Sequence, residues 1–165
     1  MAPPRTPLPS ADIQPRLHVV LVAPEIPPNT GSIARLCAAT GVRLHLIRPL
    51  GFSLDDRYLK RAGLDYWPYV DVHVHDDWQQ FRERHGRARM HFFSARATRS
   101  YLTVHYARGD VLIFGSETKG LPPALLNAHV DDTYVIPIVS PHVRSLNLSN
   151  AVSIIVYEAL RQLAD

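Results

Sequence analysis

Six short apolar runs recur along the chain at intervals that suit buried β-strands. They span residues 17–23, 43–48, 69–75, 90–94, 110–115 and 133–138. The first run is almost continuously apolar, which is typical of a strand with both faces covered. Segments with helical spacing of apolar residues separate most of the runs. We therefore predict an α/β fold, with a mostly parallel sheet flanked by helices.

The helical segments end at residues that stop helices. We predict helices at about 30–40, 55–62, 76–85 and 122–129, with Gly41, Gly63 and Gly86 following the first three and Pro122 suiting the first turn of the fourth. The clearest helix covers 147–163, where apolar residues recur every three or four positions: Leu148, Val152, Ile155, Ala159 and Leu163. Ala151 and Val156 widen this apolar stripe, which suggests a second face that a partner subunit could cover.

Length and composition indicate one ordinary domain. The chain has 165 residues, 46% of them hydrophobic, enough to bury a core without disulfides or metals. We assign residues 17–165 to a single domain and expect residues 1–16, with four prolines in the first nine positions, to form a disordered extension. No apolar run approaches the roughly 20 residues that cross a bilayer. With one cysteine, Cys37, in an apolar stretch, the pattern favours a reduced, cytoplasmic protein.

The basic residues are unevenly divided between lysine and arginine. Of 18 basic residues only Lys60 and Lys119 are lysines, and the formal net charge is +3. The planar guanidinium group matches phosphate and stacks on bases, so this bias favours an anionic partner. Arginine-rich codon usage is an equally good explanation on composition alone.

Three loops that follow predicted strands are candidates for the site, because sites in such folds lie at the carboxyl ends of strands. They cover residues 24–35, 114–122 and 137–150. In the second loop, Gly115 and Gly120 have the spacing of a phosphate-binding loop, but Leu121 and Pro122 replace the Lys and Ser/Thr that it requires. No GxGxxG follows the first strand. A P-loop nucleotidase and an ordinary dinucleotide-binding site are both disfavoured.

Two histidines are candidate metal ligands. His73 and His75 fall on the same face of a predicted strand, but no cysteine or carboxylate cluster at ligand spacing accompanies them. We expect both to be surface histidines and predict no metal site.

Taken together, the three loops resemble the ordered motifs of the SPOUT methyltransferases, in the TrmH-like branch that methylates ribose. Residues 29–35 resemble the first motif, 112–122 the second and 145–162 the third, while Ser116 departs from the proline of many relatives. The resemblance extends over residues 17–163. It is greatest to the members that modify the wobble nucleotide of tRNA, and the stretch 51–67 is one of those that carry this closer resemblance.

This resemblance implies both a fold and an activity. The fold is a SPOUT fold with a C-terminal deep trefoil knot, in a homodimer whose sites are completed near the subunit interface. The activity is methyl transfer from S-adenosylmethionine, leaving S-adenosylhomocysteine, to the ribose 2'-hydroxyl of cytidine or uridine 34 in the tRNA anticodon stem-loop. Two alternatives stay open: the same reaction on ribosomal RNA or another tRNA position, and an RNA-binding module without catalysis.

The resemblance also assigns roles to residues. The catalytic set is Arg35, Asn29, Glu117, Ser145 and Asn147. The donor-binding set is Phe93, Ser94, Gly115, Ile136, Ser145 and Leu146. The RNA-binding set is Arg48, Arg57, Lys60, Arg61 and Arg144, with Tyr66 or Trp67 able to stack on a base.

Some of these residues have competing interpretations. Because a guanidinium stays protonated, we expect Arg35 to bind a phosphate and stabilise the developing alkoxide and not to act as a base. Glu117 could instead cap a helix, and Ser145 or Asn147 could be the N-cap of the last helix. Gly115 is expected where the backbone must approach a ligand closely.

Overall fold

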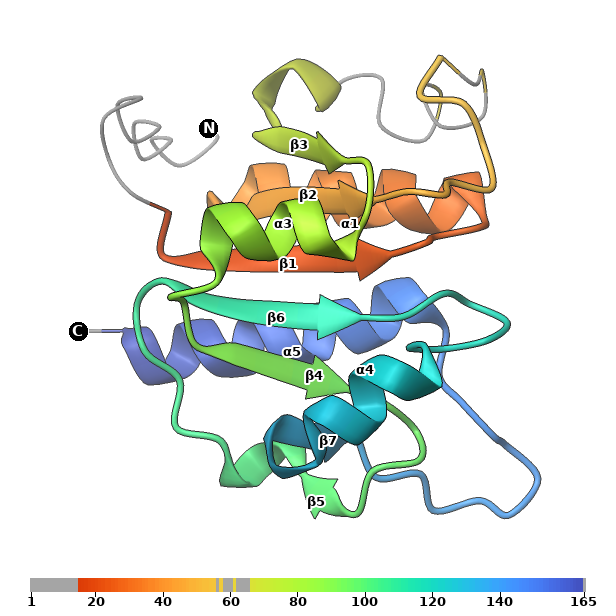
Figure 1. Cartoon of the computed structure of the whole chain (residues 1–165), viewed down its shortest axis with the longest axis vertical. Helices are drawn as coiled ribbons and strands as arrows, with labels where there is room; N and C mark the ends of the chain where they lie inside the picture. The colour runs from red at the N-terminus through yellow and green to blue at the C-terminus, as the bar shows by residue number, and fades with distance from the viewer. Residues whose placement is uncertain (1–14, 56, 58–60, 62–65, 165) are drawn as a thin grey trace, which may run out of the picture.

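A computed structural model describes residues 15–55, 57, 61 and 66–164. Its centre is a seven-stranded sheet in the order β3-β2-β1-β6-β4-β7-β5, with every strand pair parallel (Figure 1). The strands are β1 Leu17–Val22, β2 Arg43–Ile47, β3 Val72–His75, β4 Met90–Phe93, β5 Arg99–Ser100, β6 Asp110–Phe114 and β7 Thr133–Val135. The predicted parallel α/β fold is confirmed.

Each predicted apolar run contains one strand, although some strands are shorter than the runs. The run at 69–75 becomes a strand only from Val72, because Trp67–Tyr69 form a 3-10 helix, η1, with Pro68 in its first turn. The run at 133–138 stops pairing at Val135, shortly before Pro137, whose nitrogen carries no proton for a ladder bond. The two-residue β5 was not predicted, because so short a strand leaves no periodic pattern.

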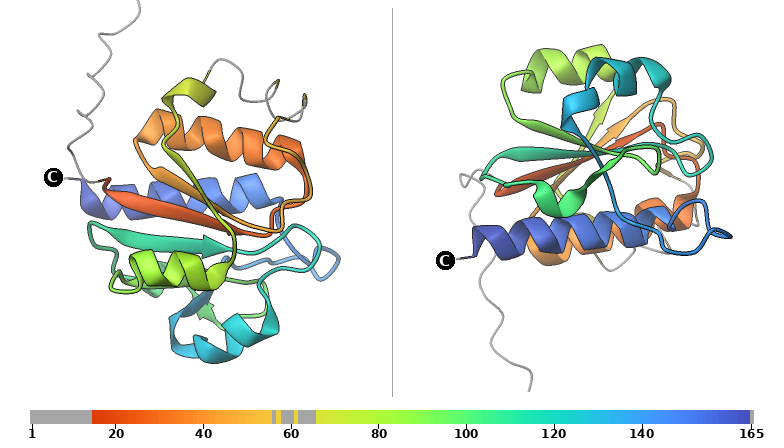
Figure 2. Two further views of the ribbon diagram at one scale, coloured as in Figure 1. Left: turned by 45° about the horizontal axis from the view of Figure 1, so that its top comes forward. Right: turned by 90° about the horizontal axis from the view of Figure 1, so that it is seen from below.

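Helices cover both faces of the sheet. On one face lie α1 (Pro27–Thr40) and α5 (Leu148–Leu163), and on the other α3 (Trp78–His85) and α4 (Pro123–Ala128), as Figures 1 and 2 show. Two further 3-10 turns, η2 (Tyr101–Thr103) and η3 (Val130–Asp132), connect strands at the β5 side. The helix predicted at 55–62 falls mostly on residues outside those described.

The helix α1 begins three residues earlier than predicted, at Pro27 and not at Thr30. Its first two positions are Pro27 and Pro28, whose nitrogens have no proton to leave unpaired and whose φ angles suit a helix. The N–H groups of Asn29 and Thr30 then both bond to the Ile26 carbonyl, at 3.1 and 3.4 Å. The predicted end is confirmed: Gly41 takes the left-handed conformation, with φ of 69°.

Two apolar layers hold the helices on the sheet. The larger layer joins α1 and α5 to the strands, and the predicted stripe residues Val152, Ile155 and Ala159 are fully buried in it. Val156 is also fully buried in this layer, so the suggestion that it widens a face free for a partner is wrong. On α5 the exposed large apolar side chains are Ile154 and Tyr157, whereas Leu148, Leu160 and Leu163 are partly buried.

Three expectations about the chain as a whole have different outcomes. Among the described residues, no helix is both long enough and apolar enough to span a membrane. Residues 1–14 of the predicted disordered extension lie outside the described residues. Of the other two, Arg16 accepts a 2.7 Å hydrogen bond through its carbonyl oxygen from the Gly109 N–H. The trefoil knot stays a prediction from the resemblance.

Replacing Ile155 by alanine should lower the free energy of unfolding by about 2–5 kcal/mol, because a fully buried side chain is lost and a cavity remains. Val130→Ala is the control, since Val130 is 65% exposed and its loss should change stability by less than about 0.5 kcal/mol. Urea denaturation followed by circular dichroism gives both values. Equal effects would contradict the burial of α5 against the sheet.

Candidate active site

The three motif loops meet because the strands before them are parallel and therefore end at the same edge of the sheet. The predicted donor-binding residues follow this rule. Phe93 ends β4 and is followed by Ser94, Gly115 follows β6, and Ile136 follows β7. Since β6, β4 and β7 are neighbours, these positions lie side by side along one edge of the sheet, which the arrowheads of β6 and β4 mark in Figure 1. Ser145 and Leu146 lie in the exposed segment 136–147 that leads from this edge to α5.

The loop after β6 is a tight hairpin. The backbones of Ser116 and Gly120 exchange two hydrogen bonds, of 2.9 and 3.3 Å, and the Ser116 hydroxyl accepts a third from the Lys119 N–H. A Cβ on Gly115 would lie 2.0 Å from the carbonyl carbon of Gly120 and 2.1 Å from the Leu121 nitrogen. Glycine is thus required here by the return of the loop onto itself, and its close approach to a ligand stays a prediction.

Glu117 connects this hairpin to the loop that begins α1. Its carboxylate accepts hydrogen bonds from the backbone N–H groups of Glu25, at 2.7 Å, and Ile26, at 3.3 Å. In return the Thr118 hydroxyl donates to the Glu25 carboxylate, at 2.7 and 2.8 Å from its two oxygens. Hydrogen bonds from Thr118 and then Ser116 lower the pKa of Glu25, which keeps it ionised. Glu117 thus holds the two loops together and does not cap α4, whose start has no side-chain cap hydrogen bond.

Asn147 connects the third motif to the first. It is the N-cap of α5, as one interpretation predicted, and its Oδ1 accepts from the N–H groups of Ser149 and Asn150, at 2.9 and 3.3 Å. Its Nδ2 donates to Oδ1 of Asn29, at 3.1 Å, across 118 residues of sequence. Asn29 is buried in the first turn of α1. These two amides therefore fix the start of α5 against the start of α1.

Arg35 stands apart from these contacts. It lies six residues after Asn29, about 9 Å further along the α1 axis at 1.5 Å per residue. Its side chain is exposed, and its guanidinium carbon lies 4.7 Å above the centre of the Tyr66 ring, within cation–π range. Among the described residues, no hydrogen bond joins Arg35 to the other predicted catalytic residues.

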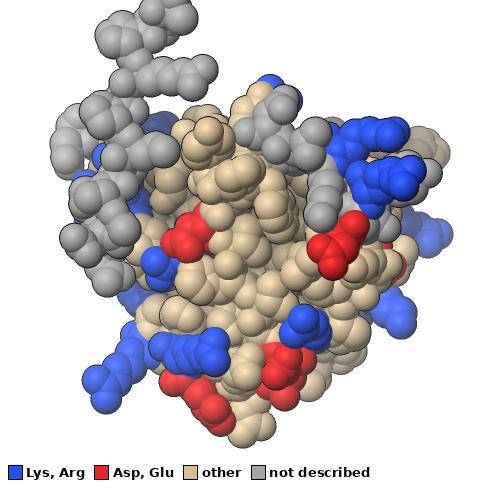
Figure 3. Space-filling model, turned by 90° about the horizontal axis from the view of Figure 1, so that it is seen from above, with Lys and Arg blue, Asp and Glu red and all other residues tan. Residues whose placement is uncertain are grey.

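The predicted RNA-binding residues that the structure describes are exposed, but they do not all have a free side chain. Arg48 is ion-paired with Asp76 at 3.0 Å, and Lys60 lies outside the described residues. Arg57, Arg61 and Arg144 are exposed. On the face shown in Figure 3, basic side chains lie around the rim and the middle is largely uncharged.

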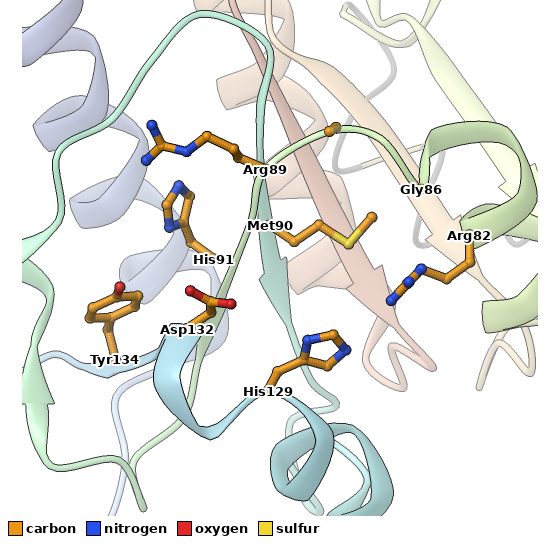
Figure 4. A pocket seen from close by; sticks show the side chains of 9 residues that line it. Arg82, Gly86, Arg89, Met90, His91, His129, Asp132 and Tyr134 are labelled. Atoms are coloured by element: carbon orange, nitrogen blue, oxygen red, sulfur yellow. The ribbon is translucent and has the colours of Figure 1, made fainter.

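A cavity of about 330 Å³ lies at the opposite edge of the sheet, where β4 begins. In Figure 4, Arg82, Met90 and His129 lie to one side of β4, and His91 and Tyr134 lie to the other. The buried His91 bonds through Nε2 to the buried Asp110 carboxylate at 2.8 Å. This cavity lies where the strands begin. It is therefore separate from the motif loops, which lie at the carboxyl ends of the strands, where parallel sheets bind ligands.

Sequence reasoning missed the pairing of Glu25 and Thr118. Both residues lie in the motif loops, but the bond between them joins positions 93 residues apart. The complementary donor and acceptor types were the available signal, and nothing local indicated which partners would meet.

The fold and the joined loops define a parallel α/β protein whose site is built on the carboxyl edge of β1, β6, β4 and β7. The chain belongs to the SpoU rRNA methylase family, whose model matches residues 16–157.

Individual relatives extend over nearly the whole chain. A tRNA (cytidine(34)-2'-O)-methyltransferase from Escherichia coli K12 is 51% identical over 148 residues, covering 89% of this chain and 94% of that protein. A solved structure described as giving insights into the 2-OH methylation of C/U34 on tRNA has a TM-score of 0.85 and 52% identity, covering 89% of this chain and 95% of that one. An AdoMet-bound rRNA methyltransferase from Sinorhizobium meliloti, 24% identical, shares the fold with a TM-score of 0.81, covering 93% of this chain and 60% of that one.

Replacing Asn147 can separate its two roles. Asn147→Ser should keep the cap, because serine is a good N-cap, but its hydroxyl is too short to reach Asn29. Asn147→Ala should lose both contacts and lower the free energy of unfolding by about 1 kcal/mol. Both variants should weaken binding of S-adenosylhomocysteine by about 2- to 10-fold, the value of one hydrogen bond. Calorimetric titration measures the affinity and thermal unfolding measures the stability.

The exposed Asn127 of α4 offers a matched control, Asn127→Ala, that should change neither measurement. If the serine variant binds S-adenosylhomocysteine as tightly as the unaltered chain does, the Asn29–Asn147 bond does not shape the donor site.

Proposed function

We propose that this chain transfers a methyl group from S-adenosylmethionine to the ribose 2'-hydroxyl of nucleotide 34, a cytidine or uridine, in tRNA. The observation that carries the proposal is the joining of all three motif loops at one sheet edge through Glu117 and Asn147. Relatives with this activity in their names, about half identical over nearly the whole chain, support the substrate. Positioning two reactants in this way contributes much of the acceleration of a displacement reaction.

The residues at this edge suit a donor made of an adenine, a ribose and a charged sulfonium. Ile136 and Leu146 offer partly exposed apolar side chains, and the segment 136–147 between them contains no helix or strand. Its backbone N–H and carbonyl groups can therefore bond a purine edge, as in many cofactor sites. We assign donor binding to this segment together with Phe93, Ser94, Gly115 and Ser145. When bound, S-adenosylmethionine supplies the electrophilic methyl group, and the reaction as proposed requires no metal.

Arg35 is proposed to act on the RNA side of the reaction. Stacking on Tyr66 holds its guanidinium at the surface, where its donors can contact an RNA phosphate. A fixed cation beside the 2'-oxygen also stabilises the negative charge that develops as the proton leaves. Since Arg35 lies about two turns along α1 from Asn29, we propose that the site is completed in a homodimer, near the subunit interface.

The remaining partners follow from the substrate. The anticodon stem-loop presents nucleotide 34 unpaired in a loop, where a ribose is accessible. Arg57, Lys60, Arg61 and Arg144, with Arg48, are the proposed phosphate contacts, and loss of several should reduce the salt dependence of binding. A tRNA-modifying enzyme of this kind would act in the cytoplasm.

The proposal is tested with the purified full chain, methyl-labelled S-adenosylmethionine and anticodon stem-loop RNAs. Nuclease digestion and nucleoside mass spectrometry should detect 2'-O-methylation at position 34, and a matched RNA with 2'-deoxy at 34 should remain unlabelled. Methylation at another position, or on ribosomal RNA alone, would contradict the assignment of the nucleotide. Donor binding without transfer to any RNA would contradict catalysis.

Changing Arg35 tests its part in the reaction. Arg35→Ala should lower turnover about 100- to 1,000-fold, as loss of one oxyanion-stabilising donor does, and Arg35→Lys should recover only part of it. The measurement is single-turnover methyl transfer against pH, with the exposed Arg87→Ala as control. A lysine variant with nearly full activity and a pH profile moved towards the pKa of the amine would show that residue 35 acts as a base.

A further inference from the structure

Three histidines form a hydrogen-bonded row across neighbouring strands, beneath α3. Nδ1 of His18 on β1 lies 2.9 Å from Nε2 of His45 on β2, and Nδ1 of His45 lies 2.9 Å from Nε2 of His75 on β3. His45 and His75 are 0% and 1% exposed. The expectation that His75 is a surface histidine is therefore wrong, whereas His73 is exposed as expected.

A fourth imidazole closes over this row from α3. The ring of His85, the last residue of that helix, lies 4.8 Å from the ring of His45 and 6.0 Å from that of His75, centre to centre. One ring nitrogen from each of His45, His75 and His85 lies within 4.8 Å of the other two. Phe81, one turn earlier in α3, packs against all three rings and is fully buried.

Hydrogen bonding alone leaves this cluster incomplete. A neutral imidazole has one N–H and one bare nitrogen, and in this row Nδ1 of His75 is buried and bonds to no group of the described residues. An unmatched buried polar atom carries a free-energy cost and calls for an explanation. Both rings are buried, and an imidazole binds a metal in its neutral form.

We propose that His45, His75 and His85 bind a divalent transition-metal ion of the zinc class. Three imidazoles and one open position form a common zinc arrangement, with metal–nitrogen distances of about 2.0–2.1 Å. Such distances place the nitrogens about 3.3 Å apart in a tetrahedron, so the ring movements needed are about 1 Å. A water molecule would take the fourth position.

The surroundings favour an ion that prefers nitrogen ligands. The guanidinium groups of Arg43 and Arg84 lie near the cluster and repel a cation, so binding depends on the three imidazole ligands. The nearby Asp71 is ion-paired with Arg43 at 2.6 Å and bonded to His73 at 2.7 Å. Without a free carboxylate in the cluster, magnesium and calcium have no oxygen ligands there, whereas zinc, cobalt, nickel and copper bind imidazole.

The position of the cluster indicates a structural role. It lies on the sheet face covered by α3, whereas α1, which contains Asn29 and Arg35, covers the other face together with α5. A bound ion would tie the end of α3 to β2 and β3. Ligand binding to the folded state alone raises the unfolding temperature, so the ion should stabilise the chain without taking part in methyl transfer.

The test uses the full chain without a histidine tag, stripped with a chelator and dialysed. Cobalt(II) titration should give the visible absorption of a tetrahedral site at one ion per chain, and zinc should displace it. His85→Ala, which removes the most exposed of the three ligands, should weaken zinc binding by more than the roughly 10- to 100-fold that follows loss of an outer-shell partner. His105→Ala, which removes an exposed histidine outside the cluster, should bind like the unaltered chain.

Thermal unfolding provides an independent readout. Zinc should raise the unfolding temperature of the unaltered chain and of His105→Ala, and should leave that of His85→Ala unchanged, while far-ultraviolet circular dichroism confirms that each variant is folded. Absence of a tetrahedral cobalt spectrum in the unaltered chain, or equal zinc binding by His85→Ala and His105→Ala, would overturn the proposal. Neither measurement depends on methyl transfer, so its outcome is separate from that of the proposed function.

Discussion

The carboxylate of Glu117 bonded to the backbone of Glu25 and Ile26 is the contact on which the site depends. The helix α1 begins with two prolines and has no side-chain cap of its own, so the chain entering it is positioned from outside the helix. Glu117 can reach it only because Gly115 lets the hairpin fold back onto Gly120. The glycine at position 115, the shape of the hairpin and the position of the start of α1 therefore all depend on this one contact.

The Asn29–Asn147 bond adds the third loop to this arrangement. It is formed at the first turns of two helices that pack on the same face of the sheet, where the backbone N–H groups of each helix point towards its start. A single amide side chain, that of Asn147, satisfies N–H groups of α5 while it bonds to α1. Helix capping and site assembly are therefore the same interaction here, which is why the structural and the functional interpretations of Asn147 do not exclude each other.

The two faces of the sheet have different chemistry. The face under α1 and α5 is lined mainly by aliphatic and aromatic residues. The face under α3 contains the histidines of β1, β2 and β3, whose burial makes them neutral. Residues alternate between faces along a strand, so His45 lies among apolar neighbours in sequence and yet joins a polar cluster in space.

The sequence by itself determined the parallel α/β fold, the glycine that ends α1, the buried stripe of α5 and the residues of the three motif loops. It could do so because each depends on local periodicity or on the conformational range of single residues. The tertiary structure alone decided that Glu117 meets Glu25, that Val156 packs within its own chain and that His75 is buried beside His45 and His85. Those outcomes depend on which distant segments share a face or an edge of the sheet. The spacing of residues along the chain does not specify which distant segments come together.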